Sequence, residues 1–149
     1  MKSGDNSPIL AACKTKSERQ LDQMRKIATD MFGDHPNYLI GVNGSVARRE
    51  CTSGSDVDLF FLINGKITIS DARKAQDAYR SRLKDIGLVM PALGGVFENP
   101  LKINNLLRTI GGDADTNEFI TRRMLFLLEG EWTFNQQLFE QTRSRLIER

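Results

Sequence analysis

Residues 44–63 read GSVARRECTSGSDVDLFFLI and decide which fold the chain is expected to adopt. Asp56 and Asp58 stand two positions apart, and because side chains along a strand alternate between its faces, both carboxylates are predicted to project from the same side. The apolar, aromatic-rich residues 59–63 follow directly and are typical of a strand buried on both faces. The two aspartates are therefore predicted to lie at the rim of a core strand.

A second part of the pattern lies just upstream of the aspartates. Residues 38–42 predict a short buried strand, residues 43–45 a tight turn, and residues 46–50 one helical turn whose first backbone N–H groups are free. Gly44 has no side chain to block close approach of the backbone to a ligand, and the Ser45 hydroxyl can donate to a phosphate oxygen. The sequence therefore predicts a phosphate-binding turn, with the cation of Arg48 one helical turn further on.

A Gly-Ser turn and helix followed by an Asp-x-Asp strand resembles the signature of the polymerase-beta-type nucleotidyltransferase superfamily. The resemblance covers about residues 38–63 and includes the Ser-Asp-x-Asp-Leu form of the motif. The chain also resembles, more loosely, bacterial nucleotidyltransferase domains related to protein-uridylylating regulators of nitrogen metabolism. This looser resemblance does not imply that the chain shares the substrate of those regulators. The residues that carry the superfamily resemblance are Gly44, Ser45, Ser55, Asp56 and Asp58.

The resemblance implies metal-dependent transfer of a nucleoside monophosphate from a nucleoside triphosphate to an acceptor. Mg²⁺, or Mn²⁺ in its place, is usually held by one or two carboxylates plus substrate phosphates, which Asp56 and Asp58 can supply. In a two-metal site, one ion activates the acceptor oxygen and the other stabilises the leaving pyrophosphate. The expected nucleotide-binding residues are Gly44, Ser45, Arg48 and Ser55.

In the superfamily a third catalytic carboxylate lies on a later strand, beyond a helix. The sequence predicts a helix over about residues 71–86, capped by Ser70 and ended by Gly87, and then an extended stretch over residues 88–97. Glu98 closes this stretch and is its only acid, so it is the positional candidate for the third carboxylate.

The sequence around Glu98 also favours a second interpretation. The glycines that precede it are typical of a turn, and this context favours a solvated residue beside a turn, or beside the start of the next helix, over a catalytic carboxylate. Asp113 and Asp115 are rival candidates, although their positions predict a linker and the N-cap of a later helix.

Helix and turn signals predict the rest of the chain in outline. A capping box at Ser17 predicts a helix over about residues 17–32, behind a flexible N-terminal tail over residues 1–16. Asn64-Gly65 predicts a hairpin turn, with residues 66–69 returning as a short antiparallel strand. Three more helices are predicted, beginning at Pro100, at Asp115 and at about Asn135, and the last of them runs to Arg149. The helix from Asp115 has an apolar stripe that consists of Phe119, Ile120, Leu127 and Leu128.

Composition limits the classes of protein and partner. A chain of 149 residues with 40% hydrophobic and 27% charged residues predicts one domain, and a formal charge of +2 is too small to indicate a nucleic-acid partner. Arg122 and Arg123 are expected on a solvated helix face. The single histidine, His35, favours neither a zinc site nor a histidine-based triad.

The cysteines and the hydropathy pattern predict a cytoplasmic protein. Cys13 and Cys51 lack metal-type spacing and are expected to be reduced thiols, and no apolar run has the length of a membrane span.

The expected fold is an α/β (α+β) domain of the nucleotidyltransferase type, in which a small mixed β-sheet packs with helices. Residues 17–99 are expected to form the catalytic core, and residues 100–149 a helical C-terminal segment that packs on it.

Two functions from different classes remain open at this point. One is a nucleotidyltransferase, with ATP expected on cellular abundance alone and a protein or small molecule as acceptor. The other is a catalytically weak or inactive nucleotide-binding module that binds a partner, as an antitoxin does. The sequence leaves the oligomeric state open.

Overall fold

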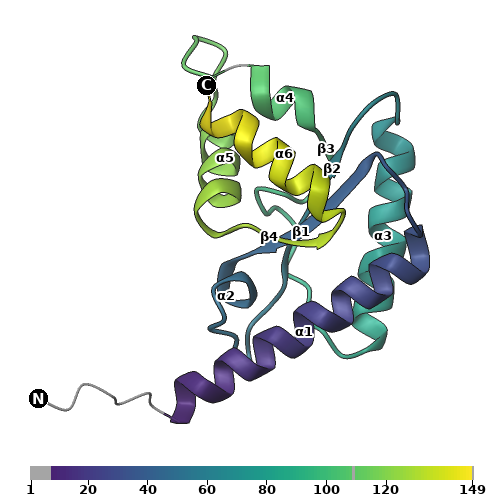
Figure 1. Cartoon of the computed structure of the whole chain (residues 1–149), viewed down its shortest axis with the longest axis vertical. Helices are drawn as coiled ribbons and strands as arrows, with labels where there is room; N and C mark the ends of the chain where they lie inside the picture. Colours follow the sequence, from purple (N-terminus) through teal and green to yellow (C-terminus); the bar gives the residue numbers. More distant parts are fainter. Residues whose placement is uncertain (1–7, 109, 149) are drawn as a thin grey trace, which may run out of the picture.

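A four-stranded mixed sheet forms the centre of the protein, in the strand order β3-β2-β1-β4 (Figure 1). The computed structural model describes residues 8–108 and 110–148. β1 (Tyr38–Asn43) pairs antiparallel with both β2 (Asp58–Ile63) and β4 (Glu131–Phe134), whereas the short β3 (Leu101–Lys102) runs parallel to β2. The predicted α/β class with a small mixed sheet is confirmed.

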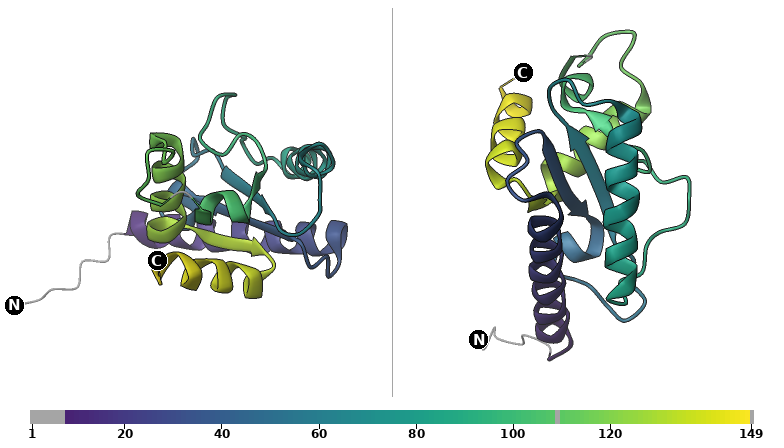
Figure 2. Two further views of the ribbon diagram at one scale, coloured as in Figure 1. Left: turned by 90° about the horizontal axis from the view of Figure 1, so that it is seen from above. Right: turned by 90° about the vertical axis from the view of Figure 1, so that its right-hand side faces the viewer.

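Helices cover both faces of the sheet, and the right-hand view of Figure 2 shows the strands between α6 and α3. α1 (Pro8–Phe32) and α3 (Ile69–Asp85) pack with the side chains of Ile40 and Phe61 in one apolar core. α4 (Ile103–Arg108), α5 (Asn117–Glu129) and α6 (Gln136–Ile147) pack with those of Leu39 and Phe60 in another. Neighbouring residues of each strand therefore serve opposite cores, as the alternation of strand side chains requires.

α1 begins earlier than the capping box predicts. Residues 8–16 are helical, so the predicted tail is wrong for them, while residues 1–7 lie outside the described part of the chain. Ser17 is buried within the helix: its hydroxyl donates to the Cys13 carbonyl oxygen at 2.8 Å and accepts from the Cys51 backbone N–H at 3.1 Å. Ser17 therefore joins α1 to the loop before β2 instead of capping the helix. Both cysteines are free thiols, as predicted.

The chain between β2 and α3 does not form the predicted hairpin strand. After Asn64, whose N–H donates to the Asn37 carbonyl oxygen, the chain turns directly into α3. Thr68, not Ser70, caps that helix, because its hydroxyl accepts from the Asp71 backbone N–H. Gly87 follows the end of α3 with a φ of +86°, which agrees with its predicted role as a helix stop.

The C-terminal part is helical as predicted, but it also contributes two strands. Pro100 precedes β3 and does not open a helix, since α4 begins at Ile103. Residues 131–134 form β4, which the sequence did not predict and which extends the sheet beside β1. Residues 88–97 contain no strand. α6 begins after Asn135 as predicted, with Asn135 as its N-cap, whereas Arg149 lies outside the described residues.

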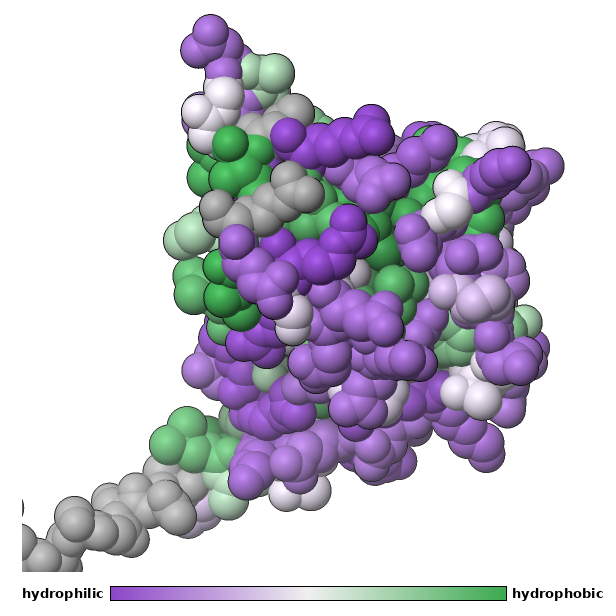
Figure 3. Space-filling model, turned by 45° about the horizontal axis from the view of Figure 1, so that its top comes forward, coloured by the Kyte–Doolittle hydropathy of each residue, from purple (hydrophilic) through white to green (hydrophobic). Residues whose placement is uncertain are grey.

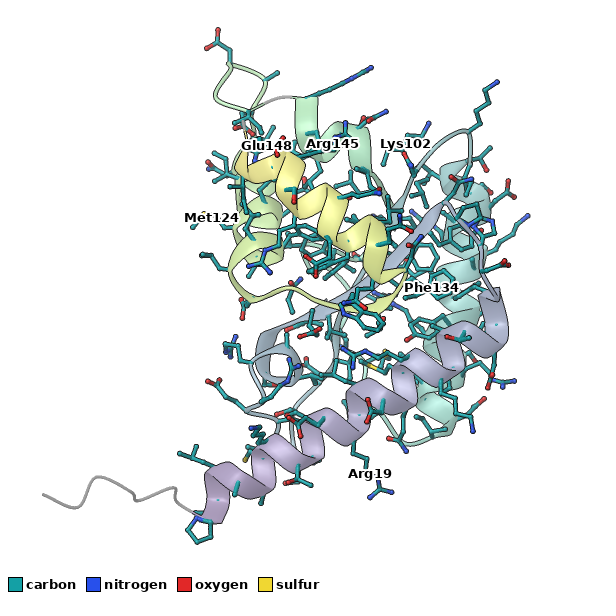
Figure 4. The ribbon with its side chains drawn as sticks, viewed as in Figure 1. Arg19, Lys102, Met124, Phe134, Arg145 and Glu148 are labelled. Carbon is teal, nitrogen blue, oxygen red and sulfur yellow. The ribbon has the colours of Figure 1, made fainter. Side chains whose placement is uncertain are left out.

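α5 faces the core with a side that only partly overlaps the predicted stripe: Phe119 and Leu127 pack against the core, partly buried, as predicted. Thr116, not Asp115, is its N-cap, and Arg122, Arg123 and Phe126 are its buried residues. The predicted core residues Ile120 and Leu128 are exposed, together with Met124, which projects outward in Figure 4. The face of the protein drawn in Figure 3 is largely hydrophilic, with some apolar areas.

Each of the two buried arginines of α5 has partners for part of its guanidinium group, although the Arg123 Nη1 has none among the described residues. Arg122 donates its Nε to the Val96 carbonyl oxygen at 2.8 Å and pairs with Glu118. Arg123 donates to both carboxylate oxygens of Asp115. The predicted solvated position of these arginines is therefore wrong.

Within the described ranges, 8–108 and 110–148, no helix has the length and apolar character needed to cross a membrane.

Candidate functional site

A cavity of about 420 Å³ lies where β1 ends and β2 begins. Its wall includes six of the seven residues that the sequence predicts for a site: Gly44, Ser45, Arg48, Asp56, Asp58 and Glu98. They come from the short helix α2 (Gly44–Ala47), the loop before β2, β2 itself and the loop before β3. Residues separated by more than fifty positions in the sequence thus share one cavity.

Strand register places the first polar pair of this cavity. Asn43 and Asp58 are direct partners in the β1–β2 ladder, so their side chains lie on the same face of the sheet. That face also carries Leu39 and Phe60, which pack under α4, α5 and α6. The cavity therefore opens at the rim of this second core, where the apolar strand residues give way to polar ones.

Gly44 is required at the turn for two reasons. Its φ of +71° lies in the left-handed region that residues with a Cβ rarely adopt. A Cβ built on Gly44 would also lie 2.5 Å from the Asp58 Oδ2, which is too close for a stable contact. The absence of a side chain at Gly44 thus lets the Asp58 carboxylate lie directly against the turn.

The pKa of Asp58 is raised above its ordinary value. Partial burial is the largest cause, and the negative charges of Asp56 and Glu129 add to it, while the Arg48 guanidinium acts in the opposite direction. Negative charge therefore gathers at this end of the cavity, and a bound cation would relieve the repulsion.

Arg48 already has acidic partners. Its Nε donates to the Glu50 Oε2 at 2.9 Å, and its Nη1 pairs with the Glu129 Oε2. The predicted role of Arg48 as a phosphate-binding cation would therefore require it to exchange at least one of these carboxylates for phosphate.

Glu98 reaches the cavity from a loop and not from a strand. Its Oε2 accepts from the Gly94 backbone N–H at 2.8 Å, and its side chain is half-buried. Because β3 runs parallel to β2 from Leu101 onward, the residues just before β3 lie alongside the start of β2. Glu98 therefore lies beside a turn, as one interpretation predicts, and also lines the cavity, while its role as a third carboxylate stays a prediction.

The other predicted acids and Ser55 take different places. Ser55 is not among the residues that line the cavity, and its Oγ accepts from the Thr52 backbone N–H at 2.9 Å, which stabilises the loop before β2. Asp113 and Asp115 also lie outside the lining, and Asp115 pairs with Arg123. The structure therefore leaves Glu98 as the only one of the three predicted candidates for a third carboxylate that lines the cavity.

Three polar residues of the cavity wall were missed by sequence reasoning: Asn43, Arg80 and Glu129. Strand alternation from the Asp58 face could have indicated Asn43, since the predicted β1 strand ends beside it. Arg80 follows the core residue Tyr79 on α3, and Glu129 is the last residue of α5. No local motif distinguishes these two from other charged residues on amphipathic helices.

The donor set of the cavity fits a magnesium ion. The carboxylates of Asp56 and Asp58 lie in its wall together with the amide of Asn43, whose buried Oδ1 has no hydrogen-bond partner among the described residues. Across the part of the chain that the structure describes, no group of three or more His, Cys, Asp or Glu side chains is arranged to hold a metal. Mg²⁺ does not need such a group, because it keeps several waters and shares phosphate oxygens with its substrate.

Comparison with known proteins adds no relative: no known protein family, no curated protein and no solved structure matches this chain. The likeness of residues 38–63 to a nucleotidyltransferase motif therefore remains a resemblance of sequence.

Proposed function

We propose that this protein is a Mg²⁺- or Mn²⁺-dependent nucleotidyltransferase of the polymerase-beta type, in fold and in chemistry. The observation that supports the proposal is that one cavity contains both the Gly44-Ser45 turn and the carboxylates of Asp56 and Asp58. A phosphate-binding turn and a pair of metal ligands are the two parts that a metal-bound triphosphate needs.

In this proposal, Asp56 and Asp58 hold the metal ion, and Gly44 and Ser45 bind the phosphates. The acceptor oxygen attacks the α-phosphorus of the nucleoside triphosphate, the bond from that phosphorus to the bridging oxygen breaks, and pyrophosphate leaves. The bound metal supplies positive charge that stabilises both the attacking and the leaving oxygens. Glu98 lies in the same cavity wall. In this proposal it takes the proton that the acceptor loses.

The first test is transfer of label from α-phosphate-labelled triphosphates, supplied one at a time with Mg²⁺ and a cell lysate as the source of acceptor. We expect a labelled acceptor with the unmodified protein and none with Asp56→Asn or Asp58→Asn, which remove charge but keep side-chain size. Asp77→Asn on α3 is the matched control, because Asp77 is exposed and outside the cavity lining. Undiminished transfer by Asp58→Asn would overturn the proposal.

The second candidate function is a nucleotide-binding regulatory module without turnover. One observation favours it: Arg48, the cation predicted for the phosphates, is already paired with two acids. Nucleotide binding without any labelled acceptor would support this function over the enzyme.

The expected preference for ATP is tested separately, by comparing the thermal shifts that the four ribonucleoside triphosphates produce with Mg²⁺. A ligand that binds only the folded state raises its stability in proportion to its affinity, so ATP should give the largest shift. Equal shifts for all four nucleotides would remove the preference.

A further inference from the structure

Two residues of the cavity wall each carry a buried polar atom, one an acceptor and one a donor, that has no hydrogen-bond partner among the described residues. Asn43 is 3% exposed, and its Oδ1 acceptor makes no hydrogen bond within the described residues. Arg80 projects from α3 into the same wall, and its Nε donor is buried and equally unpartnered in that part of the chain. Buried polar atoms are nearly always hydrogen-bonded. Of the five such unpartnered side-chain atoms in the described residues, these two belong to one cavity wall, where a ligand can supply the missing partners.

The charge of Arg80 is also free. The ion pairs among the described residues include both guanidinium contacts of Arg48, to Glu50 and Glu129, but none from Arg80. Of the two arginines in the cavity wall, Arg80 is thus the one whose planar donor group can receive an oxyanion without first losing a carboxylate.

The remaining charges of the cavity decide what kind of anion can enter. Its wall carries the carboxylates of Asp56, Asp58, Glu98 and Glu129, so a bare polyanion meets repulsion. A neutral ligand would leave the charge of Arg80 unpaired, and a lone anion would leave the Asn43 oxygen without a donor. A phosphate chain that carries its own divalent cation satisfies both ends.

We propose that Arg80 and Asn43 form the two ends of a binding position for a metal-chelated polyphosphate. The Arg80 guanidinium donates to phosphate oxygens, and the Asn43 Oδ1 faces the cation beside its cross-strand partner Asp58. Amide oxygens are accepted ligands of hard cations and good acceptors from their bound waters. The inference rests on the proposed function and deepens it, because it assigns the phosphate chain to Arg80 and not to Arg48.

Titration calorimetry with inorganic tripolyphosphate and the full chain tests the position without any nucleotide or acceptor. We expect binding by the unmodified protein in the presence of Mg²⁺ and none in its absence. Arg80→Gln should weaken that binding at least tenfold. Arg82→Gln should leave it unchanged, since Arg82 is exposed on the same helix and its loss changes the net charge equally. Arg80→Lys, which keeps the charge but not the planar donor group, should give intermediate binding.

Asn43→Leu tests the other end, because it removes an oxygen that has no partner among the described residues. We expect at least tenfold weaker Mg²⁺-dependent tripolyphosphate binding, with a melting temperature of the ligand-free protein no lower than that of the unmodified chain. A lower melting temperature with unchanged binding would show a purely structural role and overturn the assignment of Asn43.

The inference and the proposed function fail in different ways. Unchanged tripolyphosphate binding by Arg80→Gln, or equal weakening by Arg80→Gln and Arg82→Gln, overturns the inference whether or not label is transferred. Arg80-dependent binding without any labelled acceptor overturns the enzyme and leaves the inference standing. Binding of adenosine, which has no phosphate, should be the same in Arg80→Gln and the unmodified protein, so a loss there would also count against the assignment.

Discussion

Replacing Gly44 with alanine separates the contribution of this residue to folding from its contribution to the site. At a φ of +71°, an alanine costs about 1–2 kcal/mol of backbone strain. Its Cβ would also lie 2.5 Å from the Asp58 Oδ2. The carboxylate is the end of a flexible, partly exposed side chain, so we expect it to rotate away while the turn stays intact. Gly44→Ala should therefore fold but move the Asp58 carboxylate, which we propose binds the metal, away from its position beside the turn.

Gly33→Ala is the matched control for the backbone cost. Gly33 has a φ of +62°, and a Cβ there would meet no atom within 4 Å. For a domain of this length, 1 kcal/mol corresponds to roughly 2–4 °C in melting temperature, so both variants should melt about 2–8 °C lower than the unmodified protein. Only Gly44→Ala should lose Mg²⁺-dependent binding of triphosphate.

Thermal unfolding followed by circular dichroism measures the first effect, and titration calorimetry with ATP and Mg²⁺ measures the second. The reasoning is refuted if Gly44→Ala binds as tightly as the unmodified chain. It is equally refuted if Gly33→Ala loses binding to the same extent, because backbone strain alone would then explain the loss.

Three further changes test the packing of the fold. Gly41→Ala should destabilise the protein by about 3 kcal/mol in urea unfolding, because its Cβ would overlap an aromatic ring of β2 and a backbone carbonyl of β4. Tyr79→Phe should cost about 1–2 kcal/mol in the same assay without a change in slope, because it removes the buried hydrogen bond, 3.0 Å long, to the Met24 carbonyl oxygen; an unchanged midpoint would contradict this. Asp115→Asn should lower the melting temperature at pH 7, because hydrogen bonds from Arg123 and a backbone N–H hold the pKa of Asp115 below its ordinary value of 3.8. The stability that a lowered folded-state pKa provides is lost as pH falls through that pKa, so the two proteins should converge below about pH 4, and a constant difference would argue against the ion pair.

Local sequence was sufficient to predict a strand or helix when its own residues show an apolar run or a helical period. The continuous apolar run after Asp58 predicted β2, and the period of apolar residues before Gly87 predicted α3. Strand alternation predicted that the two aspartates share one side, and the resemblance to a nucleotidyltransferase motif predicted that the Gly44 turn lies beside them. The structure places Gly44, Asp56 and Asp58 in one cavity wall.

Helix and strand boundaries were predicted less well, because competing local signals differ little in energy. Ser17 and Ser70 both have the side chain of an N-cap, yet α1 continues through Ser17 and Thr68 caps α3. In α1, the Ser17 hydroxyl is hydrogen-bonded to the backbone of Cys13 and Cys51, so it does not cap a helix end. Tertiary contacts worth about 1 kcal/mol are enough to move such a boundary.

The amino-acid sequence by itself determined the α/β class, the strand that begins at Asp58, and the glycine turn beside it. Only the tertiary structure decided that residues 131–134 form β4, since that strand exists through hydrogen bonds to β1, about ninety positions away. The same holds for the convergence of Arg80 and Glu129 on the cavity. Whether a charged residue on an amphipathic helix points to solvent or into a cavity depends on how that helix packs, and packing is settled by the summed contacts of the whole chain.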